Sequence, residues 1–319
     1  MNKKERVLTA INGGMADHVP TCFSLHFPRE WAFGGEGVNS HLDFFKYTDT
    51  DVLKIMNENL VPYMGEIRRP EDWDKIRKIA LTDDFMVSQL NMVDEILEKC
   101  EKDAFVVATL HGTVASGIHP IEDVYGYESV RELFCAHMRE NPQPMADAFK
   151  RLSEGMGMLA QKLISMGVDG IYYAALGGEE YYFADDEFGK YIAPLDKMIL
   201  SAAKEAGGYN FLHMCKDKLN LDRYRSYNEV VDVVNWGVYE DNISLDEGKA
   251  IFGDTTIMGG LQNRSGVFVD GTDDELAAEV KNVIAHQGKE KFILGADCTL
   301  ATETDYSRIK LISDTAHKI

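Results

Sequence analysis

The sequence predicts an α/β fold, and the architecture it favours is a single (β/α)8 TIM barrel with an N-terminal elaboration. Short apolar runs alternate with longer helical patterns through most of the 319 residues. This alternation implies parallel strands joined by right-handed crossovers. No Ser/Pro-rich linker, low-complexity tract or short repeat divides the chain, so residues 1–319 are expected to form one domain. One barrel of this class spans roughly 250 residues or more. A doubly wound open sheet is the second architecture that fits.

Seven short apolar runs are predicted to be strands, and the longer periodic segments are predicted to be helices. The predicted strands are Val19–His26, Ala104–His111, Gly170–Leu176, Tyr209–Cys215, Val231–Val238, Thr255–Leu261 and Lys291–Cys298. The predicted helices are Ser129–Met138, Gln143–Met166, Asp186–Ala206, Leu245–Phe252, Asp273–His286 and Asp305–His317. The helix at Asp273 has the clearest start, because Thr272 can cap it and an acidic first turn complements the helix dipole.

The connection Phe27–Asn39 is predicted to be a mobile loop that follows the first strand. It contains the run Gly34-Gly35-Glu36-Gly37. The strand, glycine-rich turn and helix of a dinucleotide site are missing from it, as is the Gly-Lys-Ser/Thr of a P-loop. We therefore expect a lid rather than a phosphate-binding loop.

The composition excludes several classes of partner. The chain has 33 Lys+Arg against 53 Asp+Glu, a formal charge of −20. Nucleic acids and anionic membrane surfaces are bound through clustered basic residues, so neither is expected here. No apolar run approaches the ~18 residues of a membrane span, and the first residues do not form a secretory signal. Five cysteines, an odd and sparse set, indicate reduced thiols in a cytoplasmic protein.

The segment Tyr209–Cys215 carries the most informative motif, the pair His213 and Cys215. Residues two apart in a strand point to the same face, so both side chains are expected to project together. Alone the pair is weak evidence, because a core histidine beside a buried cysteine is the commoner arrangement. Cys298 strengthens it, since this cysteine also falls at the predicted carboxyl end of a strand, the face where barrel enzymes assemble their sites. One imidazole and two thiolates with a fourth position open form a catalytic type of zinc site.

Four other residues are candidates for acid–base or substrate contacts, each with a structural alternative. His26 and His111 end predicted strands and face either the site or a hydrogen-bonding partner at the strand end. Glu180, like its neighbour Glu179, either reaches the site or is a surface charge of its loop. Asp297 either orients a ligand beside Cys298 or caps the last helix.

Aromatic and glycine residues supply the candidates for contacts with a bound cofactor, namely Tyr172 and Gly260. Tyr172 and Tyr173 are adjacent in a predicted strand, so they point to opposite faces and at most one lines the site. Basic residues near the predicted strand ends are few: Arg29, Lys216 and Arg264. A neutral or zwitterionic small molecule therefore fits at least as well as an anionic one.

Several short motifs resemble the uroporphyrinogen decarboxylase superfamily, and together they span nearly the whole chain. They are Arg6-Val7-Leu8-Thr9-Ala10-Ile11-Asn12-Gly13, Asp17-His18-Val19-Pro20, Gly167-Val168-Asp169-Gly170-Ile171, Ala193-Pro194, Gly259-Gly260-Leu261 and Gly295-Ala296-Asp297-Cys298. The resemblance implies a (β/α)8 barrel, in agreement with the pattern. The superfamily contains porphyrinogen decarboxylases and zinc-dependent, cobalamin-linked methyltransferases such as those that methylate coenzyme M.

The methyltransferase branch is the one that the motifs resemble more closely. Decarboxylases carry an arginine-rich segment after the first strand and a Gly-His pair near the C-terminus; this chain has Arg29 beside Glu30, and Asp297 before Cys298. Methyltransferases carry H-x-C on one strand and a distant cysteine after the last, which His213, Cys215 and Cys298 match. One departure is Lys216, because the family often has glycine after the H-x-C cysteine.

The resemblance implies a zinc-dependent methyltransferase that works with a corrinoid of the methylcobalamin type. Zinc at the three ligands would activate a small-molecule thiol that attacks the methyl group, or in reverse activate a methyl donor for Co(I). The chain has no D-x-H-x-x-G corrinoid signature, so the corrinoid is expected on a partner protein. The alternatives are a uroporphyrinogen decarboxylase-like carboxy-lyase and a non-catalytic barrel that binds a corrinoid or tetrapyrrole.

Overall fold

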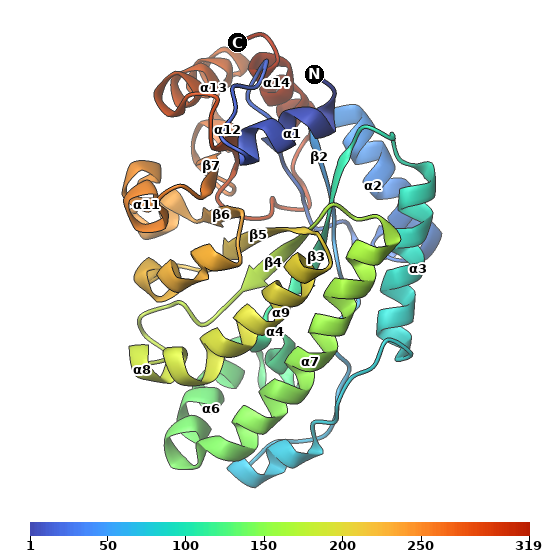
Figure 1. The fold of residues 1–319 in the computed structure, drawn as a ribbon, viewed down its shortest axis with the longest axis vertical. Coiled ribbons are helices and arrows are strands. Elements are labelled where there is room, and N and C mark those ends of the chain that lie inside the picture. The colour runs from blue at the N-terminus through green and yellow to red at the C-terminus, as the bar shows by residue number, and fades with distance from the viewer.

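The computed structural model describes residues 1–319 and confirms the predicted (β/α)8 barrel (Figure 1). The eight strands are β1 (Thr21–Cys22), β2 (Val52–Ile55), β3 (Phe105–His111), β4 (Gly170–Ala175), β5 (Tyr209–Met214), β6 (Val233–Trp236), β7 (Thr256–Leu261) and β8 (Phe292–Ala296). They form one parallel sheet in the order β1-β8-β7-β6-β5-β4-β3-β2. The Asp51 N–H donates to the Thr21 carbonyl oxygen at 3.0 Å, which nearly closes the barrel between β1 and β2.

Helices surround the sheet on its outer side, as Figure 1 shows. They are α1 (Lys3–Ile11), α2 (Gly34–Thr48), α3 (Asp84–Lys99), α4 (Thr113–Ile118), α5 (Glu122–Tyr125), α6 (Tyr127–Glu140), α7 (Pro142–Met166), α8 (Asp185–Glu187), α9 (Ala193–Glu205), α10 (Val238–Asp241), α11 (Leu245–Phe252), α12 (Gly266–Asp270), α13 (Asp273–Gln287) and α14 (Tyr306–Ala316). Shorter 3₁₀ or π turns occupy Arg29–Trp31, Pro70–Lys75, Phe188–Ile192 and Leu221–Glu229. None of the helices has the length and apolarity needed to cross a bilayer.

The core has two layers, as the inward and outward faces of parallel strands require. One cluster fills the barrel interior, and Val7 and Ile11 of α1 belong to it, so α1 closes the amino-terminal end of the barrel. A larger cluster packs between the strands and the surrounding helices. The N- and C-termini lie at this same end (Figure 1), where the rings of His18 and His317 are 4.4 Å apart. The carboxyl ends of the strands lie at the opposite end of the barrel, and the candidate site is found there.

An ion-pair network ties α1 to the bottom of the barrel. The Arg6 guanidinium donates to Asp51 at 2.5 Å and to Asp17 at 2.7 Å, and Asp51 also accepts from the Thr21 N–H at 2.8 Å. Asp51 is fully buried, so its charge depends on Arg6 for compensation. This network holds the N-terminal elaboration to β1 and β2.

Three sequence predictions about elements need correction. A strand at Val52–Ile55 was not predicted, because its apolar run is only four residues long and contains Lys54. The connection Phe27–Asn39 is not a loop throughout, because α2 begins at Gly34; Gly37 allows close packing, since a Cβ there would lie 2.9 Å from the Ala32 carbonyl oxygen. The first strand is also shorter than predicted, with only an isolated bridge from Leu25 to Leu300 beyond it.

The remaining predicted elements are confirmed within a few residues, with one subdivision. The segment predicted as a helix over Asp186–Ala206 contains α8, a π turn and α9. The predicted capping of α13 is present, because the Thr272 side chain accepts from the Glu275 N–H and the Glu275 carboxylate accepts from the Thr272 N–H. The six other predicted strands occur at the predicted places.

Candidate metal centre

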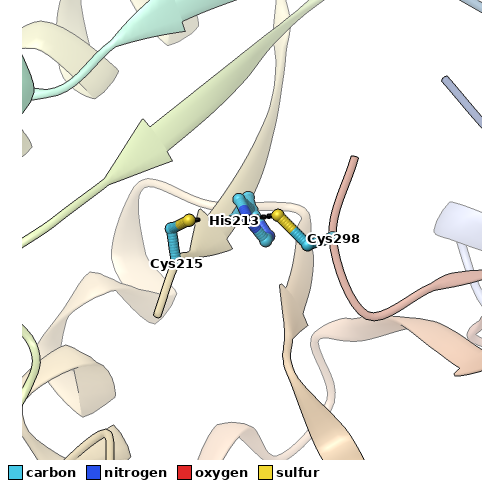
Figure 2. A group of neighbouring side chains, drawn as sticks. All are labelled: His213, Cys215 and Cys298. Atoms are coloured by element: carbon cyan, nitrogen blue, oxygen red, sulfur yellow. Dashed lines mark hydrogen bonds between the residues drawn. The ribbon is translucent and has the colours of Figure 1, made fainter. Parts of the chain in front are cut away.

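His213, Cys215 and Cys298 converge at the carboxyl ends of two strands that are distant in sequence (Figure 2). His213 is in β5, and Cys215 follows that strand on the same face. Cys298 lies two residues after β8. The Cys298 Sγ is 3.2 Å from the His213 Nε2 and 3.9 Å from the Cys215 Sγ. The sequence prediction that these side chains meet is thus in accord with the geometry.

Asn235 fixes the orientation and tautomer of His213, and the sequence analysis did not identify it. It is the partner of His213 in the β5–β6 ladder. Its Nδ2 donates to the carbonyl oxygens of Met258 and Ala296, so its Oδ1 faces His213 as an acceptor. The His213 Nδ1–H therefore donates to this oxygen at 2.6 Å, which leaves the Nε2 lone pair directed at the two cysteines.

Tyr172 supports the imidazole from one face. Its ring is stacked on His213 with centroids 5.7 Å apart, and its hydroxyl donates to the Asn235 Oδ1 at 3.1 Å. Tyr173 points the other way, into the helix layer, where its hydroxyl donates to Asp196. The predicted alternation of the two tyrosines is confirmed. Tyr172 is almost fully buried beneath the site, so its role in the geometry is to hold His213.

The two thiols share their protons unequally. The hydrogen bond from the Cys215 thiol holds the pKa of Cys298 well below its ordinary value, against the effect of burial, and His213 acts in the same direction. The same hydrogen bond, together with burial, holds the pKa of Cys215 well above its ordinary value. The pair therefore releases one proton readily and keeps the second, which a divalent cation would displace.

The donor set fits zinc in chemistry and in spacing. Zn–S bonds of about 2.3 Å at tetrahedral angles place two sulfurs about 3.8 Å apart, and the observed Sγ–Sγ separation is 3.9 Å. A disulfide is excluded by that distance, and all five cysteines are free thiols. Two soft thiolates and one imidazole with a fixed Nε2 lone pair select zinc over magnesium or calcium. Three protein ligands leave a fourth tetrahedral position for a small molecule.

Lys54 is a second residue of the candidate site that the sequence analysis missed, because it belongs to the unpredicted strand β2. Its side chain is buried at the mouth of the barrel, its Nζ donates to the Thr299 Oγ1 at 3.3 Å, and it lies 3.5 Å from the centre of the Tyr172 ring. Burial lowers its pKa to about 8, against the attraction of nearby thiols and Glu58. Lys54 therefore adds one buried basic residue to the three, Arg29, Lys216 and Arg264, that the sequence places near the strand ends.

His26 and His111 both favour the ionised form of Glu58. Their side-chain contacts are with Glu58 and His119, respectively, and not with His213, Cys215 or Cys298. The Glu58 carboxylate and the His26 Nδ1 are 2.6 Å apart. Burial opposes ionisation of Glu58, but the His26 hydrogen bond and the charges of His26, His111 and Lys54 lower its pKa overall. Burial lowers the pKa of His111 to about 4, and its ring contacts His119 with centroids 4.6 Å apart.

The two glutamates after β4 have different environments. Glu180 is exposed, as expected of a loop charge. Glu179 is fully buried and pairs with the buried Arg131, so its reading as a surface charge was wrong. Its carboxylate also accepts from the Gly177 N–H at 2.9 Å. Neither residue reaches the three ligands.

Asp297 and Gly260 also have positions distinct from the ligands. The buried Asp297 carboxylate accepts from the Tyr239 N–H at 3.0 Å, so it ties the end of β8 to the start of α10. Burial raises the pKa of Asp297 to about 7. Gly260 faces the helix layer, where a Cβ would lie 2.7 Å from Val283 of α13, so the absence of a side chain serves close packing.

Comparison with known proteins agrees with the fold. A family model described as uroporphyrinogen decarboxylase (URO-D) matches residues 53–319. No curated protein matches the sequence. A solved methyltransferase from Methanosarcina mazei is similar in fold, with a TM-score of 0.75 and 16% identity over 100% of this chain and 99% of that one.

Two methionine synthases share the fold at lower similarity. A B12-independent enzyme from Shewanella sp. W3-18-1, solved with selenomethionine, has a TM-score of 0.56 and 12% identity over 94% of this chain and 97% of its own. A putative B12-independent enzyme from Listeria monocytogenes has a TM-score of 0.57 and 11% identity over 94% and 96%. The family model covers most of the chain, and the chain belongs to the uroporphyrinogen decarboxylase family.

Proposed function

We propose that this protein is a zinc-dependent methyltransferase that moves a methyl group between a corrinoid, carried by a partner protein, and a small-molecule thiol or methyl donor. The observation that carries the proposal is the convergence of His213, Cys215 and Cys298, with the His213 Nε2 directed at the two sulfurs. The family alone does not require such a site. The fold shared with the Methanosarcina methyltransferase supports the proposal at the level of architecture.

The residues of the chain divide the work between holding the metal and positioning it. The two thiolates would balance the two positive charges of a bound zinc ion. The site would then carry no net negative charge that disfavours loss of the proton from a substrate thiol. Asn235 and Tyr172 keep the imidazole from rotating, which preserves the open fourth position at the barrel mouth. Zinc bound at this place would lower the pKa of a thiol ligand, and the thiolate is the nucleophilic form.

His26 and His111 are proposed to handle protons at the far side of the mouth. His111 is held neutral by burial, and His26 is exposed and hydrogen-bonded to Glu58. Because the His26 side chain is exposed, a donor or acceptor in solvent can reach it directly. Asp297 is proposed to keep Cys298 in place through the hydrogen bond to the Tyr239 N–H.

The test is demethylation of methylcob(III)alamin, followed by visible absorbance. The wild-type protein should transfer the methyl group to at least one acceptor in a panel of thiols and tetrahydrofolate, or take it in reverse from a methyl donor onto Co(I). His213→Ala and Cys298→Ala should lower the rate by at least about 100-fold, because each leaves only two metal ligands.

Cys135→Ala is the matched control, since Cys135 is a free thiol in α6 that lies outside the site. It should keep the wild-type rate. Absence of turnover in both directions with every acceptor, from protein that contains zinc, would contradict the proposal.

A carboxy-lyase that acts on a tetrapyrrole is the second candidate, and the family model is the observation that favours it. The chain supplies few basic residues for a substrate with many carboxylates, because Arg29 is exposed and Glu30 is its neighbour. Release of carbon dioxide from the carboxylate groups of uroporphyrinogen in the same preparation would replace the methyltransferase proposal with this one. A protein that binds methylcobalamin without turnover in either assay would be a binding barrel.

A further inference from the structure

Lys54 is the one buried cation of the protein that has no carboxylate partner. Three lysine or arginine residues are buried: Arg6, Lys54 and Arg131. The side chain of Arg223 is also buried, and it pairs with Asp185. Arg6 pairs with Asp17 and Asp51, and Arg131 pairs with Glu179. Lys54 has one hydrogen bond, to the Thr299 hydroxyl, and the face of an aromatic ring. Two of its three N–H groups therefore have no acceptor from the protein.

A buried ammonium group with so few partners is costly to the fold. Desolvation of a charge is offset only when hydrogen bonds or an opposite charge replace the lost water. The ring face of Tyr172 supplies part of that compensation. Glu58 and the nearby thiols act only at longer range, so no protein group accepts a hydrogen bond from the remaining N–H groups. A bound ligand could supply that acceptor.

The position of Lys54 points to what that ligand is. Lys54 and Cys298 line the same small cavity, together with Ser24 and Tyr172. The cavity measures about 10 Å³, which is room for about one water-sized group. Thr299, which accepts the only hydrogen bond of the Lys54 side chain, directly follows Cys298 in the chain. An oxygen atom in this cavity would thus lie between the Lys54 ammonium group and the proposed metal centre.

We propose that Lys54 binds the acid group of the substrate, and that this substrate is a small carboxylate whose thiol or other heteroatom takes the open position at His213, Cys215 and Cys298. The inference rests on the proposed function and adds a substrate class to it. One carboxylate oxygen matches the size of the cavity, and its charge completes the partners of Lys54. The chain carries a net charge of −20, so an anion needs a local cation to attract it, and Lys54 is the buried cation whose charge no carboxylate of the protein pairs with.

The test is a set of binding titrations by calorimetry on the zinc-loaded protein, with 3-mercaptopropionate, 2-mercaptoethanol and cysteamine as probes. The three thiols are similar in length and differ in charge. The wild type should bind 3-mercaptopropionate about 10- to 100-fold more tightly than 2-mercaptoethanol, the range for one charge-assisted hydrogen bond. Lys54→Met should abolish this preference and leave the affinity for 2-mercaptoethanol unchanged.

Lys218→Met is the matched control, because Lys218 is an exposed lysine in the loop after Cys215. It should keep the preference. A wild type that does not prefer the anionic thiol overturns the inference, and this outcome does not depend on the folding of any variant. Equal loss of all three thiols in Lys54→Met also overturns it, because Lys54 would then act only by balancing the charge of the cysteines.

A second pair of probes, propionate and propionamide, separates this inference from the proposed function. Neither has a thiol, so their binding reports on Lys54 without a metal–sulfur bond. If no thiol binds but propionate binds better than propionamide and loses this advantage in Lys54→Met, thiol activation is contradicted and the acid-binding role stands. If neither probe shows a Lys54-dependent preference, the acid-binding role is overturned.

Discussion

At the scale of single residues, Asn235 decides which nitrogen of His213 is available to a metal. Its Oδ1 accepts from the Nδ1–H at 2.6 Å, and its Nδ2 donates to two carbonyl oxygens. Removal of a residue that hydrogen-bonds to a metal-ligating histidine typically weakens metal binding 10- to 100-fold. Asn235→Ala should weaken zinc binding by about that factor, measured by competition with a chromophoric chelator.

Asn235→Asp is the matched variant for this prediction. Both substitutions lose the Nδ2 donor, but aspartate keeps an acceptor for the His213 Nδ1–H. Zinc affinity in Asn235→Asp should stay within a few-fold of the wild type. Equal zinc affinity in Asn235→Ala and the wild type would show that the imidazole needs no such partner.

Lys216 occupies a backbone conformation that favours glycine. Its φ is +91°, directly after the proposed metal ligand Cys215. The sequence resemblance places a glycine at this position in many family members. A side chain in this region costs about 1–2 kcal/mol, and glycine loses roughly 0.5–1 kcal/mol of that advantage through the flexibility of the unfolded chain. Lys216→Gly should therefore raise the free energy of unfolding by up to about 1 kcal/mol, measured by urea denaturation.

A side-chain contact of Lys216 acts against the gain in stability expected from Lys216→Gly. Its Nζ lies 4.4 Å from the centre of the Tyr127 ring, a favourable interaction that glycine would remove. A lower stability of Lys216→Gly would mean that this contact outweighs the backbone strain. Zinc content should be unchanged in either case.

At the scale of elements, His41 fastens α2 to the chain that follows β2. Its Nδ1–H donates to the Gly37 carbonyl oxygen at 2.6 Å, and its Nε2 accepts from the Met56 N–H at 2.8 Å. Both nitrogens are in use only when the ring is neutral, and burial lowers the pKa of His41 to about 4. The segment fastened in this way carries Lys54 and Glu58 on either side of Met56.

The low pKa of His41 makes the stability of the protein depend on pH. The folded protein disfavours the protonated ring, so this contribution is complete above the unfolded pKa of 6.5 and is lost as the pH falls from 6.5 towards 4. One such group corresponds to a loss on the order of 3 kcal/mol across that window. His41→Gln should flatten the decline, measured as the free energy of unfolding at pH 7 and at pH 4.5.

The exposed His286 provides the control, because its side chain lies on the surface of α13. His286→Gln should keep the wild-type dependence on pH. The same steep decline in His41→Gln would assign the acid sensitivity to other buried histidines, of which His111 is one.

The loop after β4 is held to α6 by the buried pair of Arg131 and Glu179. Arg131 also lies over the Tyr182 ring, 4.1 Å from its centre. Arg131→Met should cost about 3–5 kcal/mol of stability, because it leaves the buried Glu179 carboxylate without an opposite charge. The double variant Arg131→Met/Glu179→Leu should recover part of that loss in urea denaturation. A double variant less stable than Arg131→Met would contradict this account of the pair.

The elements that could be predicted from the sequence are those whose apolar runs are long or regular. The strand at Phe105–His111 is seven residues, all but the last of them buried, and periodicity suffices to find it. The strand at Val52–Ile55 has four residues and a lysine, and its burial depends on the closure of the whole barrel. Likewise, the glycines that begin α2 look like a loop until the partners of Val38 and Phe45 are known.

In the candidate site, too, some residues could be predicted from the sequence and others became evident only from the fold. His213, Cys215 and Cys298 could be predicted because few other roles need a histidine and two cysteines at strand ends. Asn235 could be suspected as the one polar residue in an apolar strand, but its partner became evident only from the β5–β6 register. Lys54 could not be placed, because a lysine in a short run is usually exposed, and only the fold shows that it points into the barrel mouth.

At the scale of the whole molecule, the charge of −20 and the site act over different distances. The acidic surface is expected to repel nucleic acids and anionic membranes, a prediction that follows from the composition. Within the barrel mouth, by contrast, the charges of Lys54 and of the proposed metal ligands set the local electrostatic field. A barrel with its own large core also needs no metal to fold, so removal of zinc by a chelator should leave the far-UV circular dichroism unchanged.

The central claim is that His213, Cys215 and Cys298 hold zinc, and X-ray absorption at the zinc edge of the purified protein tests it most directly. The account predicts about one zinc per chain, with two sulfur ligands near 2.3 Å and the remainder nitrogen or oxygen near 2.0 Å. Cys298→Ser should lose one sulfur ligand or the metal. A wild-type protein that neither contains nor takes up zinc, or a zinc ion without sulfur ligands, would contradict the account.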